Sequence, residues 1–220
     1  MWSRVRARFR EAPVTLGPTP GAREAWHKGR DTYAVWLVRV DVPAVRARVD
    51  EALAHLDGHG LGRRFGEPHV TVFVAGFPSP VPRHDDDVAE EALAAQARAL
   101  AGAPPFVLEV GDLVAFTSCA VLEVHDPGGG LAALRDRLAP HGREVRFAPY
   151  EPHVTVAAFG DTRPTGPVAT AIDAWSPRPR LAVEVLAVEL VAIDASGRDP
   201  RLRTVRTVPC GGDSSSWPAR

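Results

Sequence analysis

The chain has 220 residues, of which 45% are hydrophobic and 24% are charged, and its formal net charge at pH 7 is −1. This length and composition exclude a disordered or fibrous chain and leave ample room for a globular core. A net charge so close to zero provides no global field for nucleic acid or for an anionic membrane, so an anionic substrate would have to be recognised by local groups.

Cysteine usage and the start of the chain bear on its compartment. Cys119 and Cys210 are far apart and form no CxxC pattern, so a reducing compartment fits. Residues 1–10 are basic but lack the apolar stretch of a secretory signal, and their arginines leave a transit peptide as an alternative. No apolar run approaches bilayer-spanning length. We expect a cytoplasmic monomer that binds neither a membrane nor a DNA duplex.

The first third of the chain predicts a strand, a helix and a second strand. Residues 1–30 show no clear periodicity and are expected to be an N-terminal extension or loose cover. The apolar run Thr32–Asp41 predicts a buried strand. Pro43 then begins a helix that ends near Gly58 and Gly60, and its apolar stripe consists of Val45, Val49, Leu53 and Leu56. A strand is expected over Glu67–Phe77.

The rest of the chain continues this alternation. An Ala-rich helix is expected over Asp85–Ala101, with its acidic residues at the helix N-terminus. Asp126, as an N-cap before Pro127, predicts a further helix with Leu131, Leu134 and Leu138 buried. The remaining expected elements are strands at Phe106–Phe116, Cys119–His125, Glu151–Phe159, Leu181–Ile193 and Leu202–Val208, a short helix at Val168–Trp175 and a turn at Asp194–Gly197.

The order of these elements predicts a duplicated unit, because a strand and a helix precede a second strand in both Thr32–Phe77 and Cys119–Phe159. We therefore expect an α+β fold of two lobes related by a pseudo-twofold axis, with antiparallel sheets around a central cleft and helices outside. Residues 31–210 would form this single two-lobed domain. Residues 211–220 are small and polar and are expected to be a disordered tail.

The strongest functional signal is a repeated hexapeptide. Glu-Pro-His-Val-Thr-Val occurs at residues 67–72 and again at residues 151–156. Alternate side chains of a strand share one face, so His69, Thr71 and Phe73 are expected on one face of the first motif strand. His153 and Thr155 are expected on the corresponding face of the second. The valines between them would pack against helices, which leaves the His/Thr faces for the cleft.

Two histidines and two threonines at one point can cleave a phosphodiester without metal. One neutral imidazole can take a proton from water while a protonated partner donates one to the leaving oxygen. The threonine hydroxyls can donate hydrogen bonds to the non-bridging phosphate oxygens. We therefore expect His69 and His153 as the catalytic pair, with Thr71 and Thr155 binding the phosphate, and no cofactor.

A zinc site is the metal alternative, with His69 and His153 as ligands and Glu67 or Glu151 supplying oxygen. Zinc sites usually show three or four ligands at short local spacings. The other histidines form no such cluster with these residues, and they are His27, His55, His59, His84, His125 and His141. The sequence therefore favours a metal-free site.

Paired His-x-Thr motifs on separate strands of a two-lobed α+β chain resemble the 2H phosphoesterase superfamily, also called the 2′-5′ RNA ligase-like family. The resemblance covers about residues 30–210. It implies that His69 and His153 are catalytic and that Thr71 and Thr155 contact phosphate. It also implies metal-free hydrolysis of 2′,3′-cyclic phosphates of RNA ends or nucleotides, of ADP-ribose cyclic phosphate, or of 2′-5′ linkages.

The chain departs from the bacterial branch of that family at one position. An Arg commonly lies five residues after the second motif histidine there, whereas this chain has Ala158. Other arginines would have to supply the phosphate contact, and the candidates are Arg178, Arg180, Arg201, Arg203 and Arg206. For a base-stacking platform the candidates are Tyr150 and Phe73, because stacking on an aromatic ring holds any nucleobase.

The sequence thus predicts a phosphodiesterase that acts on a 2′,3′-cyclic phosphate or a 2′-5′ phosphodiester of a nucleotide or RNA end. The alternative from another class is a non-catalytic RNA- or nucleotide-binding module of the same fold, which would keep the phosphate site without turnover.

Overall fold

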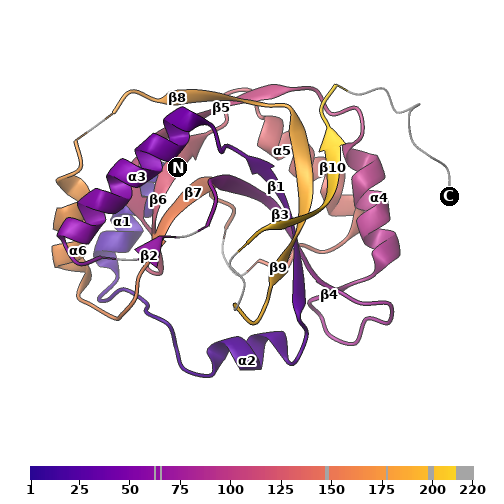
Figure 1. The fold of residues 1–220 in the computed structure, drawn as a ribbon, viewed down its shortest axis with the longest axis horizontal. Coiled ribbons are helices and arrows are strands. Elements are labelled where there is room, and N and C mark those ends of the chain that lie inside the picture. Colours follow the sequence, from indigo (N-terminus) through magenta and orange to yellow (C-terminus); the bar gives the residue numbers. More distant parts are fainter. Residues whose placement is uncertain (62, 65, 147–148, 177, 198–200, 212–220) are drawn as a thin grey trace.

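The protein is described by a computed structural model that covers residues 1–61, 63–64, 66–146, 149–176, 178–197 and 201–211 (Figure 1). Its helices are α1 (Trp2–Glu11), α2 (Ala22–His27), α3 (Pro43–Gly58), α4 (Glu90–Leu100), α5 (Gly130–Leu138) and α6 (Thr165–Asp173), with a 3₁₀ turn, η1, at Ala139–His141. Its strands are β1 (Thr32–Arg39), β2 (Arg63–Arg64), β3 (His69–Pro78), β4 (Asp87–Val88), β5 (Phe106–Ala115), β6 (Cys119–His125), β7 (His153–Ala158), β8 (Leu181–Val185), β9 (Ala187–Asp194) and β10 (Arg203–Pro209).

Within the described residues the strands form two five-stranded sheets, in the spatial orders β10-β9-β1-β3-β4 and β8-β5-β6-β7-β2. Every pairing is antiparallel except the short parallel contact of β3 with β4. The antiparallel pair β1–β3 in one sheet corresponds to β6–β7 in the other, and one helix connects the strands of each pair. The expected α+β fold with a duplicated unit is confirmed.

Each crossover helix connects two strands of one sheet but packs against the other sheet. Helix α3 joins β1 to β3 but contacts β7, and α5 joins β6 to β7 but contacts β3. Figure 1 shows the same arrangement, with α1, α3 and α6 beside one lobe and α4 and α5 beside the other. Most buried side chains of both lobes belong to one continuous apolar core. The two lobes are therefore parts of one packed body.

The predicted strand Leu181–Ile193 is wrong as a single element. It divides at the exposed Leu186 into β8, which pairs with β5, and β9, which pairs with β1. The chain crosses from one sheet to the other at this point, along the upper edge of Figure 1. The apolar pattern runs through the crossing without a break, so periodicity alone could not locate it.

The predicted helix Asp85–Ala101 begins later, at Glu90. Residues Asp87–Val88 instead pair with the end of β3, and the Asp86 and Asp87 carboxylates bind Arg30 Nη1 at 2.6 and 2.5 Å. Asp86 and Asp87 are therefore engaged with Arg30 and do not form the first turn of the helix.

The helix predicted after Asp126 is present as α5, but its N-cap is Gly129 rather than Asp126, and Pro127 lies before the helix. The Asp126 carboxylate accepts hydrogen bonds from the backbone N–H groups of Gly130 and Leu131, both at 2.8 Å. This satisfies two of the free donors at the start of α5.

The expectation of a loose N-terminal segment is wrong for residues 2–11. Trp2, Val5 and Phe9 are buried at helical spacing along α1, which contacts β5 and α6. Of the expected tail, 211–220, only Gly211 lies among the described residues. None of the helices in the described ranges combines the length and apolar character needed to span a bilayer.

Candidate active site

The two repeated motifs begin strands β3 and β7, which contact each other where the two sheets meet. A hydrogen bond also joins the motif regions, because the Tyr150 hydroxyl donates to the Thr71 carbonyl oxygen at 3.1 Å. His69 and His153 therefore lie on neighbouring strands although they are far apart in the sequence.

The motif strands show the predicted alternation over their first four residues. His69 and Thr71 are half-buried, whereas Val70 and Val72 are fully buried in the core. In β7 the same pattern holds, with His153 and Thr155 half-buried and the valines between them in the core. Each motif thus directs its imidazole and hydroxyl away from the core.

A register shift follows each motif at the same place. Leu37 pairs with Thr71 and Trp36 with Phe73, so Val72 is the extra residue of a bulge. In β7, Val156 is the corresponding extra residue between the pairings of Thr155 and Ala157. A bulge reverses which face the following side chains occupy.

The bulge at Val72 overturns one prediction. Phe73 is 2% exposed and lies in the core with Trp36, on the face opposite His69 and Thr71. The expectation that Phe73 shares the histidine face is therefore wrong, and its ring is not open to a nucleobase.

Both motif histidines are held by the same backbone contact. His69 Nδ1 lies 2.7 Å from the Glu67 carbonyl oxygen, and His153 Nδ1 lies 2.6 Å from the Glu151 carbonyl oxygen. A carbonyl oxygen can only accept, so Nδ1 carries the hydrogen in both rings. Each neutral imidazole then presents the lone pair of Nε2, and each protonated one presents an Nε2–H donor.

The electrostatic setting keeps both imidazoles neutral more readily than in water. Burial lowers the pKa of His69, and the nearby positive charge of Arg39 lowers it further. Burial also lowers the pKa of His153, and the charges of Arg146 and of His69 add to that effect. A bound anion would oppose all of these effects and favour protonation.

Arg146 is a cation at this site that the sequence reasoning missed. Its Nε donates to Glu144 Oε1 at 2.8 Å, and its Nη2 is buried and makes no hydrogen bond within the described part of the chain. A buried guanidinium donor without a partner is costly unless a ligand accepts from it. No sequence pattern marks Arg146, which lies in an irregular segment before the second motif.

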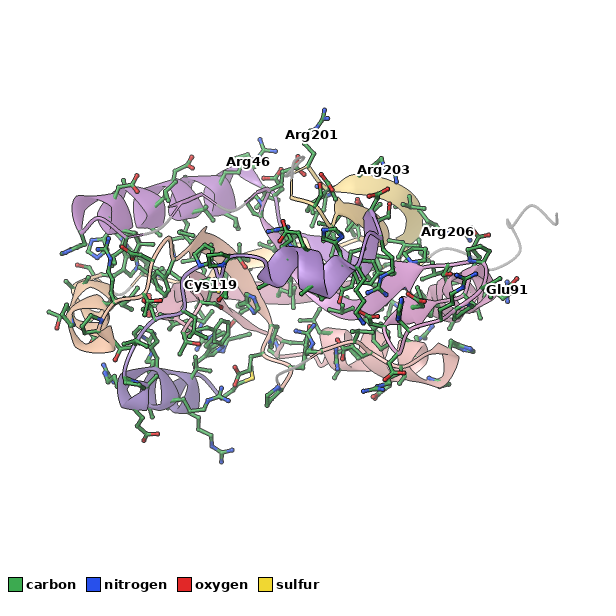
Figure 2. All side chains as sticks on the ribbon, turned by 90° about the horizontal axis from the view of Figure 1, so that it is seen from below. Arg46, Glu91, Cys119, Arg201, Arg203 and Arg206 are labelled. Atoms are coloured by element: carbon green, nitrogen blue, oxygen red, sulfur yellow. The ribbon has the colours of Figure 1, made fainter. Side chains whose placement is uncertain are left out.

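The arginines proposed from the sequence are placed differently. Arg178 lies 3.6 Å from a Glu51 carboxylate oxygen, and Arg180 lies 3.0 Å from one of Glu109. Arg203 and Arg206 line a separate cavity with Glu91, and Figure 2 shows Arg201, Arg203 and Arg206 away from Cys119, which borders the pocket of His153. Ala158 pairs with Cys119 and with Arg63 of β2.

Tyr150 lies between the two motifs and under two cations. The guanidinium carbon of Arg135 is 3.9 Å from the centre of the Tyr150 ring, and that of Arg146 is 5.1 Å from it. Together with its hydrogen bond to Thr71, this places the ring where it supports Arg146. Its role as a base-stacking platform stays a prediction.

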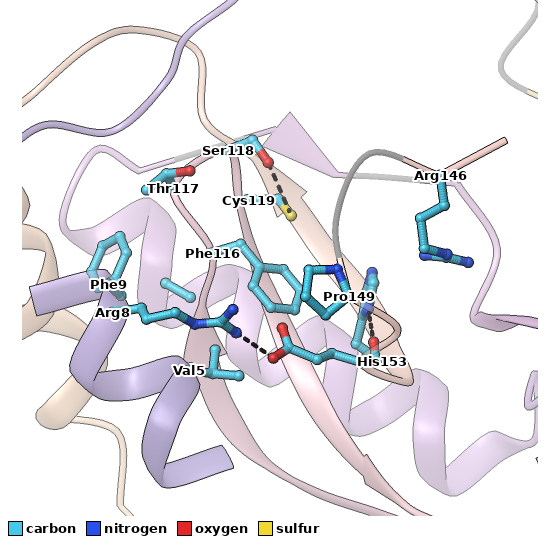
Figure 3. A pocket seen from close by; sticks show the side chains of 12 residues that line it. Val5, Arg8, Phe9, Phe116, Thr117, Ser118, Cys119, Arg146, Pro149 and His153 are labelled. Atoms are coloured by element: carbon cyan, nitrogen blue, oxygen red, sulfur yellow. Dashed lines mark hydrogen bonds and ion pairs between the residues drawn. The ribbon is translucent and has the colours of Figure 1, made fainter. Parts of the chain in front are cut away.

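His153 opens onto a pocket of about 450 Å³ (Figure 3). The Phe116 ring packs edge-on against the His153 ring, with centroids 5.0 Å apart. The pocket is lined by Val5, Arg8, Phe9, Ala115, Phe116, Thr117, Ser118, Cys119, Arg146, Pro149, Glu151 and His153.

The glutamates of the two motifs are engaged by arginines. Glu67 pairs with Arg39, and Glu151 pairs with Arg8 of α1. Among the described residues, no three His, Cys, Asp or Glu side chains come together as a metal site would require. Neither glutamate is therefore arranged as a metal ligand beside the histidines.

The fold and the paired motifs define a two-lobed α+β protein that presents two half-buried histidines from neighbouring strands. The sequence profile of the 2′-5′ RNA ligase superfamily matches residues 40–197. The chain belongs to this superfamily.

Solved structures share the fold at low sequence identity. Apo LigT of E. coli is 18% identical with a TM-score of 0.58, over 84% of this chain and 100% of LigT. The complex of E. coli LigT with 3′-AMP is 17% identical with a TM-score of 0.57 and the same coverage. The protein TT0787 of Thermus thermophilus is 17% identical with a TM-score of 0.53, over 82% of this chain and 99% of that protein. No curated protein sequence matches the chain significantly.

Proposed function

We propose that this protein is a metal-independent phosphodiesterase that hydrolyses a 2′,3′-cyclic phosphate or a 2′-5′ phosphodiester of a nucleotide or RNA end. The observation that carries the proposal is the matched pair of imidazoles. Both are fixed through Nδ1 to a backbone carbonyl, and both begin strands that contact each other, β3 and β7. Two imidazoles fixed in this way on adjoining strands would supply one base and one acid for a phosphate bound between them.

In the proposed reaction, Nε2 of one neutral histidine accepts a proton from water as the water oxygen attacks phosphorus. The bond from phosphorus to a ribose oxygen breaks, and Nε2–H of the other histidine protonates that oxygen. The product is a phosphomonoester and a free hydroxyl. Each general acid–base step of this kind contributes roughly 10²–10⁴-fold to the rate.

The remaining groups would bind the phosphate. The hydroxyls of Thr71 and Thr155 lie on the same strand faces as the histidines and can donate to its non-bridging oxygens. The Arg146 guanidinium, which lines the pocket beside His153, would supply a charged donor and take over the role expected of an Arg at position 158. Structures of E. coli LigT with 3′-AMP, with NADP⁺ and with phosphate agree with a site for phosphorylated nucleotides.

The test is a panel of 2′,3′-cyclic nucleotides, RNA with a cyclic phosphate end, ADP-ribose cyclic phosphate and 2′-5′ dinucleotides, assayed with the wild type, His69→Asn and His153→Asn. Asparagine keeps a polar side chain of similar reach but cannot transfer a proton. We expect each variant to lose at least about 100-fold in turnover and to keep the wild-type melting temperature. A wild type that binds the products tightly but cleaves none of the substrates would instead indicate the non-catalytic binding module.

A further inference from the structure

Helix α1 lies outside the region matched by the superfamily profile, yet it is firmly attached to the lobe that carries His153. Trp2, Val5 and Phe9 are buried, and the Trp2 indole N–H donates to the Val124 carbonyl oxygen at 3.2 Å. Arg8 forms an ion pair with Glu151, two residues before His153. These contacts fix α1 against β5, β6 and the start of the second motif.

The position of α1 makes it one wall of the pocket beside His153 (Figure 3). Val5, Arg8 and Phe9 of the helix form this wall, and residues 115–119 around the β5–β6 turn form another. His153 and Pro149 lie at the edge of the same space. A group bound there would therefore be adjacent to the imidazole that faces the phosphate.

The chemistry of these walls suits a planar aromatic ring with polar edges. Phe116 is half-buried, and its ring is already oriented by the edge-on contact with His153. Val5, Phe9 and Pro149 add apolar surface, while the hydroxyls of Thr117 and Ser118 and the Arg8 guanidinium provide hydrogen-bonding groups. A volume of about 450 Å³ is within the usual range for pockets that hold small molecules and exceeds what a phosphate group needs.

We infer that this pocket binds the nucleobase of the substrate and that α1 is a specificity element of the enzyme. The inference rests on the proposed function, since it places the base next to a phosphate that His69 and His153 attack. The apolar walls would hold the ring mainly by stacking and packing, because the Arg8 guanidinium is already paired with Glu151 and Ser118 is exposed to solvent. The pocket would therefore favour a substrate with a nucleobase over one without, and discriminate weakly among bases.

The inference is tested by filling the pocket from its exposed rim. Ser118 is exposed on the β5–β6 turn and lies outside the catalytic groups, so Ser118→Trp can occupy the pocket without disturbing the core. Ser3→Trp is the matched control, because Ser3 is an exposed serine on α1 that does not line the pocket. The two substrates are a nucleoside 2′,3′-cyclic phosphate and methyl riboside 2′,3′-cyclic phosphate, which lacks the base.

For the wild type we expect kcat/KM to be higher for the nucleoside substrate by about tenfold or more, which is the size of a base-stacking contribution. Ser118→Trp should remove this preference and leave the base-free substrate unchanged, whereas Ser3→Trp should behave as wild type. Equal turnover of both substrates by the wild type, or an equal loss for both in Ser118→Trp, would overturn the inference while the proposed hydrolysis stands.

A second readout separates failure of the pocket from failure of the reaction. Calorimetry measures binding of a nucleoside 3′-monophosphate and of ribose 3-phosphate to the wild type and to Ser118→Trp, without any turnover. If the wild type cleaves neither cyclic phosphate, the proposed function fails. The pocket inference is then upheld by a wild-type preference for the nucleotide that Ser118→Trp abolishes, and it is refuted if that preference is missing.

Discussion

Replacing Arg146 with methionine should weaken catalysis far more than it weakens the fold. The substitution removes a guanidinium whose Nη2 is buried and has no partner within the described residues. Glu144, which binds Arg146, keeps a second ion pair to Arg135 at 2.6 Å, so its carboxylate is not left unpaired. The main loss is therefore the hydrogen bond that Arg146 would donate to the substrate phosphate.

The size of that loss follows from the kind of contact. A hydrogen bond to a charged group contributes about 1.5–3 kcal/mol, which corresponds to a decrease of roughly 10- to 150-fold in kcat/KM. Arg146→Lys keeps the charge but loses the planar donor pair, so it should fall between the wild type and Arg146→Met. The assay is hydrolysis of a 2′,3′-cyclic nucleotide followed over a range of pH.

The pH profile gives an independent measure of the same residue. The charge of Arg146 lowers the pKa of His153, so its removal should raise that pKa and move the corresponding limb of the kcat/KM profile to higher pH. Arg143→Met is the matched control, because Arg143 is an exposed arginine in the same segment and does not line the pocket. If Arg146→Met keeps both the rate and the profile of the wild type, Arg146 does not contact the phosphate.

Three further predictions concern ionisation, metal and stability. Burial lowers the pKa of both motif histidines. The fraction of enzyme with one neutral and one protonated imidazole, and with it kcat/KM, should therefore be highest below about pH 6.5. The pH optimum of kcat should be higher than that of kcat/KM, because a bound anionic substrate raises the pKa of both histidines. Identical pH optima for kcat and kcat/KM would contradict this prediction. EDTA should leave activity unchanged, and a loss that zinc restores would support the zinc alternative. The buried Trp36 indole N–H donates to Gln96 Oε1 at 2.8 Å, and Gln96→Met would leave it without an acceptor. The substitution should therefore lower the free energy of unfolding, measured in urea, by about 1–3 kcal/mol without changing kcat. An unchanged unfolding midpoint would show that another group accepts from Trp36.

The repeated hexapeptide was enough to predict the strands that carry the histidines, and the order of the elements around it predicted the duplication of the fold. Its alternation places His69 and Thr71 on one face and the valines in the core, as observed. The fate of Phe73 could not be predicted in the same way. A bulge depends on how β3 pairs with β1, and the local sequence of a strand does not contain its partner's register.

Two other features depended on contacts between distant segments. Arg146 is positioned by Glu144 and Tyr150 within a segment that has no periodicity, so only the folded chain brings it next to His153. Helix α1 was predictable in principle, since Trp2, Val5 and Phe9 follow a helical spacing. The surrounding arginines obscured that stripe, and its place beside the pocket follows from packing on β5.

The packing of each crossover helix against the other sheet restricts movement between the two lobes. Since α3 leaves one sheet to pack on β7 and α5 leaves the other to pack on β3, neither lobe can swing away without separating the core of its neighbour. The distance between the two imidazoles is consequently set when the polypeptide folds. In the proposed reaction, the entropic cost of orienting acid and base would then be met by folding rather than by binding, with no closure of one lobe onto the other.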